Sequence, residues 1–156
     1  MNNKIKKIIF KLNASKLTLS VAESCTGGML AQHITSVSGA SKVFTFGIIT
    51  YSNKSKINYL KVPLQIIKKY GAVSKQCCLA MLVNLEKISN AKLNIAITGI
   101  AGPTGGTKKK PVGLVYLGIK KGKKIKINRY FFKNQDRKNI RKNSVKESLE
   151  LIKKFI

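Results

Sequence analysis

The first third of the chain alternates between helical and extended hydrophobic patterns. Apolar residues recur every three or four positions over residues 3–15, which predicts an amphipathic helix. Residues 17–22 alternate as in a strand and lead into a glycine-containing turn, after which a helical pattern begins near Thr26 and continues to about Ser36. A strand, a tight turn and a helix in this order are typical of the start of an α/β unit.

The rest of the chain continues this alternation and contains clear start and stop signals for helices. Pro63 and Ser74 are good first residues for helices, and Asp136 is a good N-cap for a last one. The predicted elements are strands at 43–50, 93–98, 112–119 and 125–132, and helices beginning within 51–60 and spanning 63–69, 75–89 and 137–155. This order predicts an α/β fold whose mixed sheet is covered by helices on both faces.

Length and composition favour one globular domain. The chain has 156 residues, of which 44% are hydrophobic, so it can form a sizeable core. No apolar run approaches the ~18 residues of a membrane-spanning helix, and no signal-peptide pattern is present. The three cysteines do not form a disulfide or metal pattern, and the only histidine is His33. We therefore expect a cytoplasmic protein with free thiols, no metal and no cofactor.

The formal net charge of +26 is the most unusual property of the sequence. A charge of this size suggests nucleic acid or another polyanion as a partner. However, 28 of the 31 basic residues are lysine, and they are spread from Lys4 to Lys154. Because asparagine and isoleucine are also abundant, we interpret the lysines mainly as the result of an AT-rich coding bias. Any nucleic-acid binding is then expected to be non-specific.

Two glycine-rich loops follow predicted strands, at 23–28 and 99–106. In open α/β sheets, ligands bind beyond the carboxyl ends of the strands, and glycines let backbone amides approach an anion closely. Neither loop has the spacing of a P-loop or a dinucleotide fingerprint. Two tight structural turns explain the same glycines, so this pattern alone leaves both interpretations open.

Ser24 lies in the first of these loops, where a serine is either a helix N-cap or a nucleophile. A Ser-His-Asp triad is improbable because His33 is about two helical turns away. A lysine could act as the base, but the local sequence does not indicate which one. Cys25 is a rival nucleophile or a small buried residue. Glu23 could orient a lysine, bind a ligand hydroxyl or accept backbone amides.

Five motifs in order resemble the CinA C-terminal domain family, over about residues 5–155. They are Ala22–Gly28 (AESCTGG), Gly47–Asn53 (GIITYSN) with Lys56, Gly71–Ser74 (GAVS), Thr98–Pro103 (TGIAGP) and Lys110–Gly113 (KPVG). The resemblance implies a single three-layer α/β/α sandwich. It also implies the activity of the stand-alone nicotinamide-nucleotide amidases, which convert nicotinamide mononucleotide to nicotinate mononucleotide and ammonia.

The resemblance further implies roles for individual residues. Ser24 matches the nucleophile and Lys56 the lysine that serves it, with turn amides of Thr26, Gly27 and Gly28 as oxyanion donors. Arg137 and Arg141 are the candidates for binding the nucleotide phosphate. The residues expected to contact substrate are Glu23, Thr26, Gly27, Gly28, Tyr51, Thr98, Gly99, Gly102, Arg137 and Arg141.

Two departures from the family pattern affect the loops. Lys108 and Lys109 stand where members usually carry acidic residues, and Gln135 replaces a glycine. The alternative hypothesis is a non-catalytic or drifted member that binds nucleic acid or nucleotides through its basic surface. We also expect a homodimer that does not bind membranes.

Overall fold

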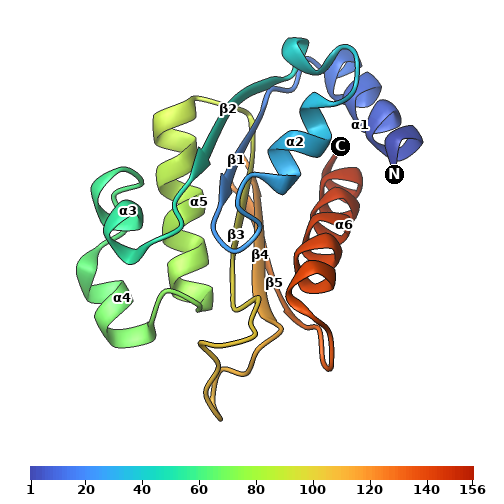
Figure 1. Ribbon diagram of the computed structural model, residues 1–156. Coiled ribbons are helices and arrows are strands. Elements are labelled where there is room, and N and C mark those ends of the chain that lie inside the picture. The colour runs from blue at the N-terminus through green and yellow to red at the C-terminus, as the bar shows by residue number, and fades with distance from the viewer.

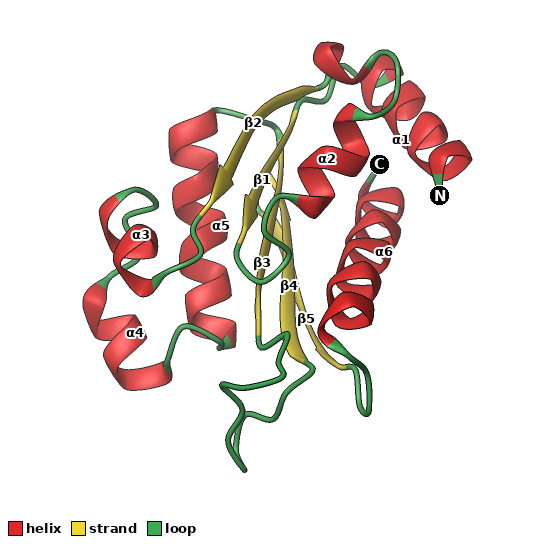
Figure 2. Cartoon of the chain, in the orientation of Figure 1, coloured by secondary structure: helices red, strands yellow, loops and turns green.

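Five strands form one mixed sheet between two layers of helices (Figures 1 and 2). The computed structural model describes all residues from 1 to 156. The sheet order is β2-β1-β3-β4-β5. The strands are β1 (Leu19–Glu23), β2 (Phe44–Ile49), β3 (Leu93–Gly99), β4 (Leu114–Lys121) and β5 (Lys124–Phe131).

The three strands β2, β1 and β3 run parallel, and their carboxyl ends lie at the same edge of the sheet. Glu23 at the end of β1 is in register with Ile49 of β2 and with Ile97 of β3. The loops that follow these strands therefore emerge side by side. The hairpin of β4 and β5 completes the sheet in the antiparallel sense.

Helices cover the two faces in separate groups (Figure 1). The helices α1 (Asn2–Ala14), α2 (Met29–Thr35) and α6 (Arg137–Phe155) pack together on one face. On the other face, α5 (Lys75–Ser89) crosses β1, β3 and β4, and α4 (Leu64–Tyr70) packs against α5. The short helix α3 (Asn53–Asn58) follows β2 on that same side.

Each face of the sheet has its own hydrophobic core. The larger cluster joins the apolar stripe of α1 to one face of the strands and to α6, with Ile5, Ile8 and Leu12 almost inaccessible to solvent. The smaller cluster lies beneath α5 and includes Cys77 and Cys78. Because β1 and β3 are covered on both sides, their residues are buried almost without exception, as expected for central parallel strands.

The three-layer α/β/α sandwich predicted from the sequence is confirmed, and most boundaries differ by only one or two residues. Side-chain caps occur where they were predicted, since Ser74 accepts the amide of Cys77 and Asp136 accepts that of Asn139. The largest difference is the start of α2, which begins at Met29 rather than near Thr26. Positive φ angles at Gly27 and Gly28 prevent an earlier start. None of the helices is long and apolar enough to span a membrane.

Candidate active site

A serine and a lysine from different segments meet beyond the carboxyl ends of β1 and β2. The Nζ of Lys56 lies 2.9 Å from the Oγ of Ser24. Ser24 directly follows β1, and Lys56 is carried by α3, which follows β2. The side chains are 1% and 7% exposed for Lys56 and Ser24, respectively. The structure thus brings together the two residues that the family resemblance implied as a pair.

Local structure fixes the position of Lys56. Ser52 caps α3 in a capping box with Ser55, so this six-residue helix has a defined start one turn before Lys56. The Nζ of Lys56 also donates to the carbonyl oxygen of Thr50 at 2.7 Å. The Oγ of Ser24 and the carbonyl of Thr50 together hold the amine in one place, although the lysine side chain is long and flexible.

Burial changes the chemistry of this amine. Removal from water disfavours the ammonium form, so the pKa of Lys56 is lowered from its ordinary value of 10.5. No carboxylate forms an ion pair with Lys56, because the salt bridges of the structure join Lys4 to Glu150 and Lys120 to Glu86. A lysine with these surroundings can lose its proton and accept one from a neighbouring hydroxyl.

Glu23 supports the turn that carries Ser24. Its carboxylate is completely buried and accepts backbone amides of Gly28, Leu30 and Ala31 at 2.8–3.1 Å. These bonds join the end of β1 to the start of α2, where helix amides lack partners. Of the three roles left open by the sequence, the structure shows the acceptance of backbone amides. Substrate contact by Glu23 stays a prediction.

The turn amides are used differently from the prediction. The amide of Gly27 donates to the carbonyl of Ser24 at 3.0 Å, and that of Gly28 donates to Glu23. Both N–H groups thus already have acceptors within the protein, and substrate contact by these two glycines stays a prediction. The amides of Cys25 and Thr26 have no backbone or side-chain oxygen as an acceptor, and the Cys25 N–H lies within hydrogen-bonding reach of its own thiol.

Cys25 is a buried packing residue. Its side chain is only 6% exposed, and burial raises the pKa of its thiol to about 12. A thiol with so high a pKa carries almost no nucleophilic thiolate near neutral pH. The environment therefore favours Ser24 over its neighbour as the reactive group.

The second glycine-rich loop packs tightly beside the first. Thr98 is buried and its hydroxyl donates to the carbonyl of Ala72 at 2.8 Å, which links β3 to the connection before α5. A Cβ on Gly99 would lie 2.7 Å from a methyl of Val115 and 3.1 Å from the Sγ of Cys25. Gly99 is thus required by the close approach of three segments, and substrate contact by Thr98 and Gly99 stays a prediction.

Two arginines of α6 connect the loops around Ser24. Arg137 donates to the carbonyl of Gly102 at 2.9 Å and to the hydroxyl of Tyr51 at 2.6 Å. Arg141 donates to the carbonyl of Thr26 at 2.8 Å, and its Nε is buried without a partner. The two arginines therefore join three other residues expected at the site to α6: Arg137 contacts Gly102 and Tyr51, and Arg141 contacts Thr26.

Sequence reasoning missed two contributors to this site. Thr50 supplies the carbonyl that orients Lys56, and its own hydroxyl is buried without a partner. Lys110 reaches from the loop before β4 to the carbonyl of Tyr70, so this loop is attached to the end of α4. Both residues belong to the sequence motifs. Their contacts could not be predicted, because the acceptors are backbone carbonyls, which every residue has.

The geometry defines a class of protein: an α/β/α sandwich with a buried serine–lysine pair at the carboxyl ends of the parallel strands of its sheet. The model of the CinA C-terminal domain matches residues 2–156. The chain belongs to the CinA C-terminal domain family.

Relatives and solved structures agree with this assignment. The CinA-like protein of Kosmotoga olearia is 42% identical over 149 residues, which are 96% of this chain and 36% of that protein. The CinA-like protein of Pseudothermotoga lettingae is 47% identical over 136 residues, covering 86% of this chain and 33% of that protein. The chain thus spans about a third of the length of these curated relatives.

The fold also resembles that of solved structures of this family. The crystal structure of a competence/damage inducible protein from Agrobacterium tumefaciens superposes with a TM-score of 0.94 at 36% identity. The match covers 97% of this chain and 92% of that chain. The shared architecture therefore extends over the whole of the described sandwich.

Proposed function

We propose that the protein is an amidohydrolase that converts nicotinamide mononucleotide to nicotinate mononucleotide and ammonia. The observation that carries the proposal is the 2.9 Å contact between Ser24 Oγ and Lys56 Nζ in a buried setting that lowers the pKa of the lysine. A neutral amine in this place is a general base for the serine hydroxyl. The choice of substrate rests on the family resemblance of the motifs.

In the first half of the proposed reaction, Ser24 attacks the carboxamide carbon. The Ser24 proton moves to the neutral amine of Lys56, and a C–O bond forms while the carbonyl π electrons move to oxygen. The amides of Cys25 and Thr26 are the donors proposed to stabilise that oxyanion. The C–N bond then breaks, and Lys56 returns the proton to the leaving nitrogen, so that ammonia departs and an ester remains on Ser24.

In the second half, water hydrolyses the ester. Lys56 takes a proton from water as the oxygen attacks the ester carbonyl, and it then protonates Ser24 Oγ as the C–O bond breaks. The acid product leaves as the carboxylate, and its proton passes to solvent. Serine and lysine end as they began. The Thr50 carbonyl keeps the amine in place through both halves, because it accepts an N–H that the neutral amine still possesses.

Binding of the nucleotide phosphate is assigned to the arginine side of the site. Arg137 and Arg141 both reach loops that flank Ser24, and guanidinium groups suit the bidentate recognition of phosphate. The unpartnered Nε of Arg141 is consistent with a group that still has donor capacity. Tyr51 is 57% exposed beside Arg137 and can contact the ribose or the ring.

The test is the incubation of purified protein with nicotinamide mononucleotide and the measurement of both products. The proposal expects ammonia and nicotinate mononucleotide in a ratio of one to one. Nicotinamide riboside, which lacks the phosphate, should be hydrolysed at least about tenfold less efficiently, because a hydrogen bond to a charged group contributes about 1.5–3 kcal/mol. If neither product forms above the level of a Ser24→Ala control, the proposal is wrong.

A further inference from the structure

A line of hollows crosses the protein around α1, far from the Ser24 loop. Four hollows are consecutive because each shares lining residues with the next: Lys4 belongs to the first two, Lys7 and Lys11 to the second and third, and Lys6 and Phe10 to the third and fourth. Two of them have volumes of about 370 Å³. We call this surface the α1 track; its charged residues are Lys4, Lys6, Lys7, Lys11, Lys42, Lys146 and Lys153.

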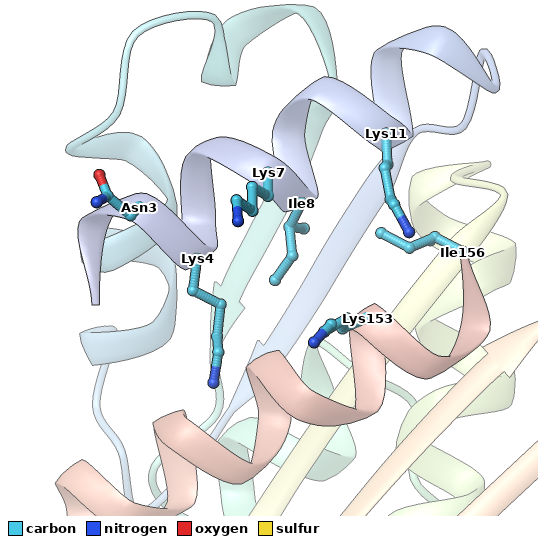
Figure 3. A pocket seen from close by; sticks show the side chains of 7 residues that line it. All are labelled: Asn3, Lys4, Lys7, Ile8, Lys11, Lys153 and Ile156. Atoms are coloured by element: carbon cyan, nitrogen blue, oxygen red, sulfur yellow. The ribbon is translucent and has the colours of Figure 1, made fainter.

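Lysines from both ends of the chain converge on one of the two 370 Å³ hollows of the α1 track (Figure 3). Lys4, Lys7 and Lys11 lie at helical spacing along α1, and Lys153 projects from the last turn of α6. A spacing of three and four residues along a helix places the Cβ atoms of these lysines about 5–6 Å apart on one side of the helix. Ile8 and Ile156 contribute the apolar part of the lining.

The α1 track is almost free of neutralising acids. Of the five acidic residues, Glu150 alone pairs with one of its lysines, Lys4. The other six lysines have no carboxylate partner, because the second salt bridge of the protein joins Lys120 to Glu86. Clustering of like charges opposes folding, so an extended anion that binds all of them would relieve repulsion along the whole line.

An exposed aromatic ring lies in the middle of these amines. Phe10 is 74% exposed, whereas the other apolar side chains of α1, Ile5, Ile8, Ile9 and Leu12, are buried in the core. Phe10 lines two adjacent hollows together with Lys6. A basic groove with an aromatic ring on which bases can stack is the arrangement that binds single-stranded nucleic acid.

From these observations we propose that the α1 track is a binding surface for single-stranded nucleic acid, with phosphates along the lysines and a base stacked on Phe10. A membrane surface fits less well, since an interfacial helix needs a free apolar face and that face of α1 is packed in the core. Figure 1 places α1 at the end of the sheet away from the loop after β1, so this binding does not require the amidase site.

The test measures binding of a single-stranded oligothymidylate of 20 nucleotides at several salt concentrations. Lys7→Ala/Lys11→Ala should lower the salt slope by roughly 1.4, the value for two lost contacts on a single strand. The matched control is Lys68→Ala/Lys75→Ala, which removes two exposed lysines on the α4 and α5 side and should leave the slope unchanged. An equal loss in both double variants would overturn the proposal in favour of diffuse charge attraction.

Phe10 separates nucleic acid from other polyanions. Phe10→Leu should weaken oligothymidylate binding at least about fivefold, since base–aromatic stacking contributes 1 kcal/mol or more. Phe10→Tyr should bind like the original protein, and inorganic polyphosphate should bind both variants equally. Circular dichroism checks folding, which an exposed side chain should not affect. If Phe10→Leu changes nothing, or if only anionic lipid vesicles depend on Phe10, the nucleic-acid assignment is wrong.

Discussion

The Nζ of Lys56 meets the Oγ of Ser24 at 2.9 Å although 32 positions separate the two residues. The sheet register explains the encounter. The amide of Thr50 donates to the carbonyl of Glu23 at 2.8 Å, which keeps the chain after β2 beside the turn after β1. The carbonyl of Thr50 then accepts the lysine amine. Parallel pairing of β1 and β2 is thus the structural basis of the serine–lysine pair.

Replacement of the buried lysine should remove activity without unfolding the protein. Lys56→Met keeps the length of the side chain but has no basic nitrogen, so we expect turnover to fall at least about 100-fold, as for loss of a general base. The matched control is Lys54→Met, an exposed lysine two residues earlier in α3. Steady-state kinetics and a thermal melt of both variants check this. Full turnover by Lys56→Met would show that the base lies elsewhere.

The lowered pKa of Lys56 predicts the direction of a pH profile. The active form is the neutral amine, so kcat/KM should rise with pH through the Lys56 pKa and level off below the ordinary value of 10.5. Rates are measured at constant ionic strength, because the other lysines respond to salt. A profile that falls over this range would mean that the ammonium form is the active one.

The same pKa makes stability depend on pH. Between the lowered pKa of folded Lys56 and the value of 10.5 in the unfolded chain, the unfolded state binds the extra proton. The contribution of Lys56 to the free energy of unfolding therefore increases as pH rises through that window. Below the window this increase is absent. Urea titrations at several pH values should show a steeper rise for the original protein than for Lys56→Met. Parallel curves would contradict the assigned shift.

Glu23→Gln should destabilise the turn that carries Ser24. The glutamine has one acceptor oxygen where the carboxylate has two, and its amide group adds buried donors beside the N–H groups of Gly28, Leu30 and Ala31. We expect a loss of about 2 kcal/mol in the free energy of unfolding, measured by urea denaturation. The comparison variant is Ser20→Ala. Ser20 lies in β1 and is fully buried like Glu23, so this variant gives the cost of losing another buried polar group. An unchanged midpoint would show that the three bonds do not stabilise the turn.

Arg137→Lys should affect substrate binding more than chemistry. A lysine keeps the charge but cannot reach both the Gly102 carbonyl and the Tyr51 hydroxyl with a planar fork. We expect KM for nicotinamide mononucleotide to rise about tenfold, with kcat changed less. Lys138→Ala, the next residue on α6, is the control for loss of a nearby positive charge. A fall in kcat alone would place Arg137 in the chemical step instead.

Much of the fold could be predicted because its elements carry local signals. The stripe of Ile5, Ile8 and Leu12 identifies α1, and Ser74 and Asp136 mark the starts of α5 and α6. The pairing of Ser24 with Lys56 has no such signal, since it depends on strand register; the family motifs supplied it. The resemblance therefore predicted a contact that local reasoning left open among 28 lysines.

The contacts at the site that sequence reasoning did not anticipate have a common physical origin. Glycines in the turn suggested free amides, but Gly27 and Gly28 donate to Ser24 and Glu23 within the protein. A glycine in a sequence shows that the backbone can adopt a positive φ there. It does not show which acceptor the N–H of that glycine will contact. The carbonyl of Thr50 was missed for the same reason, because every residue has one.

The most direct test of the central claim compares two neighbouring residues, Ser24 and Cys25, as the nucleophile. Ammonia release from nicotinamide mononucleotide is measured for Ser24→Ala and Cys25→Ala, with folding checked by circular dichroism. The account predicts that Ser24→Ala loses activity at least about 1,000-fold, whereas Cys25→Ala retains it within a few fold, because Cys25 is a packed thiol with a pKa near 12. Activity that survives in Ser24→Ala and disappears in Cys25→Ala would contradict the serine–lysine mechanism.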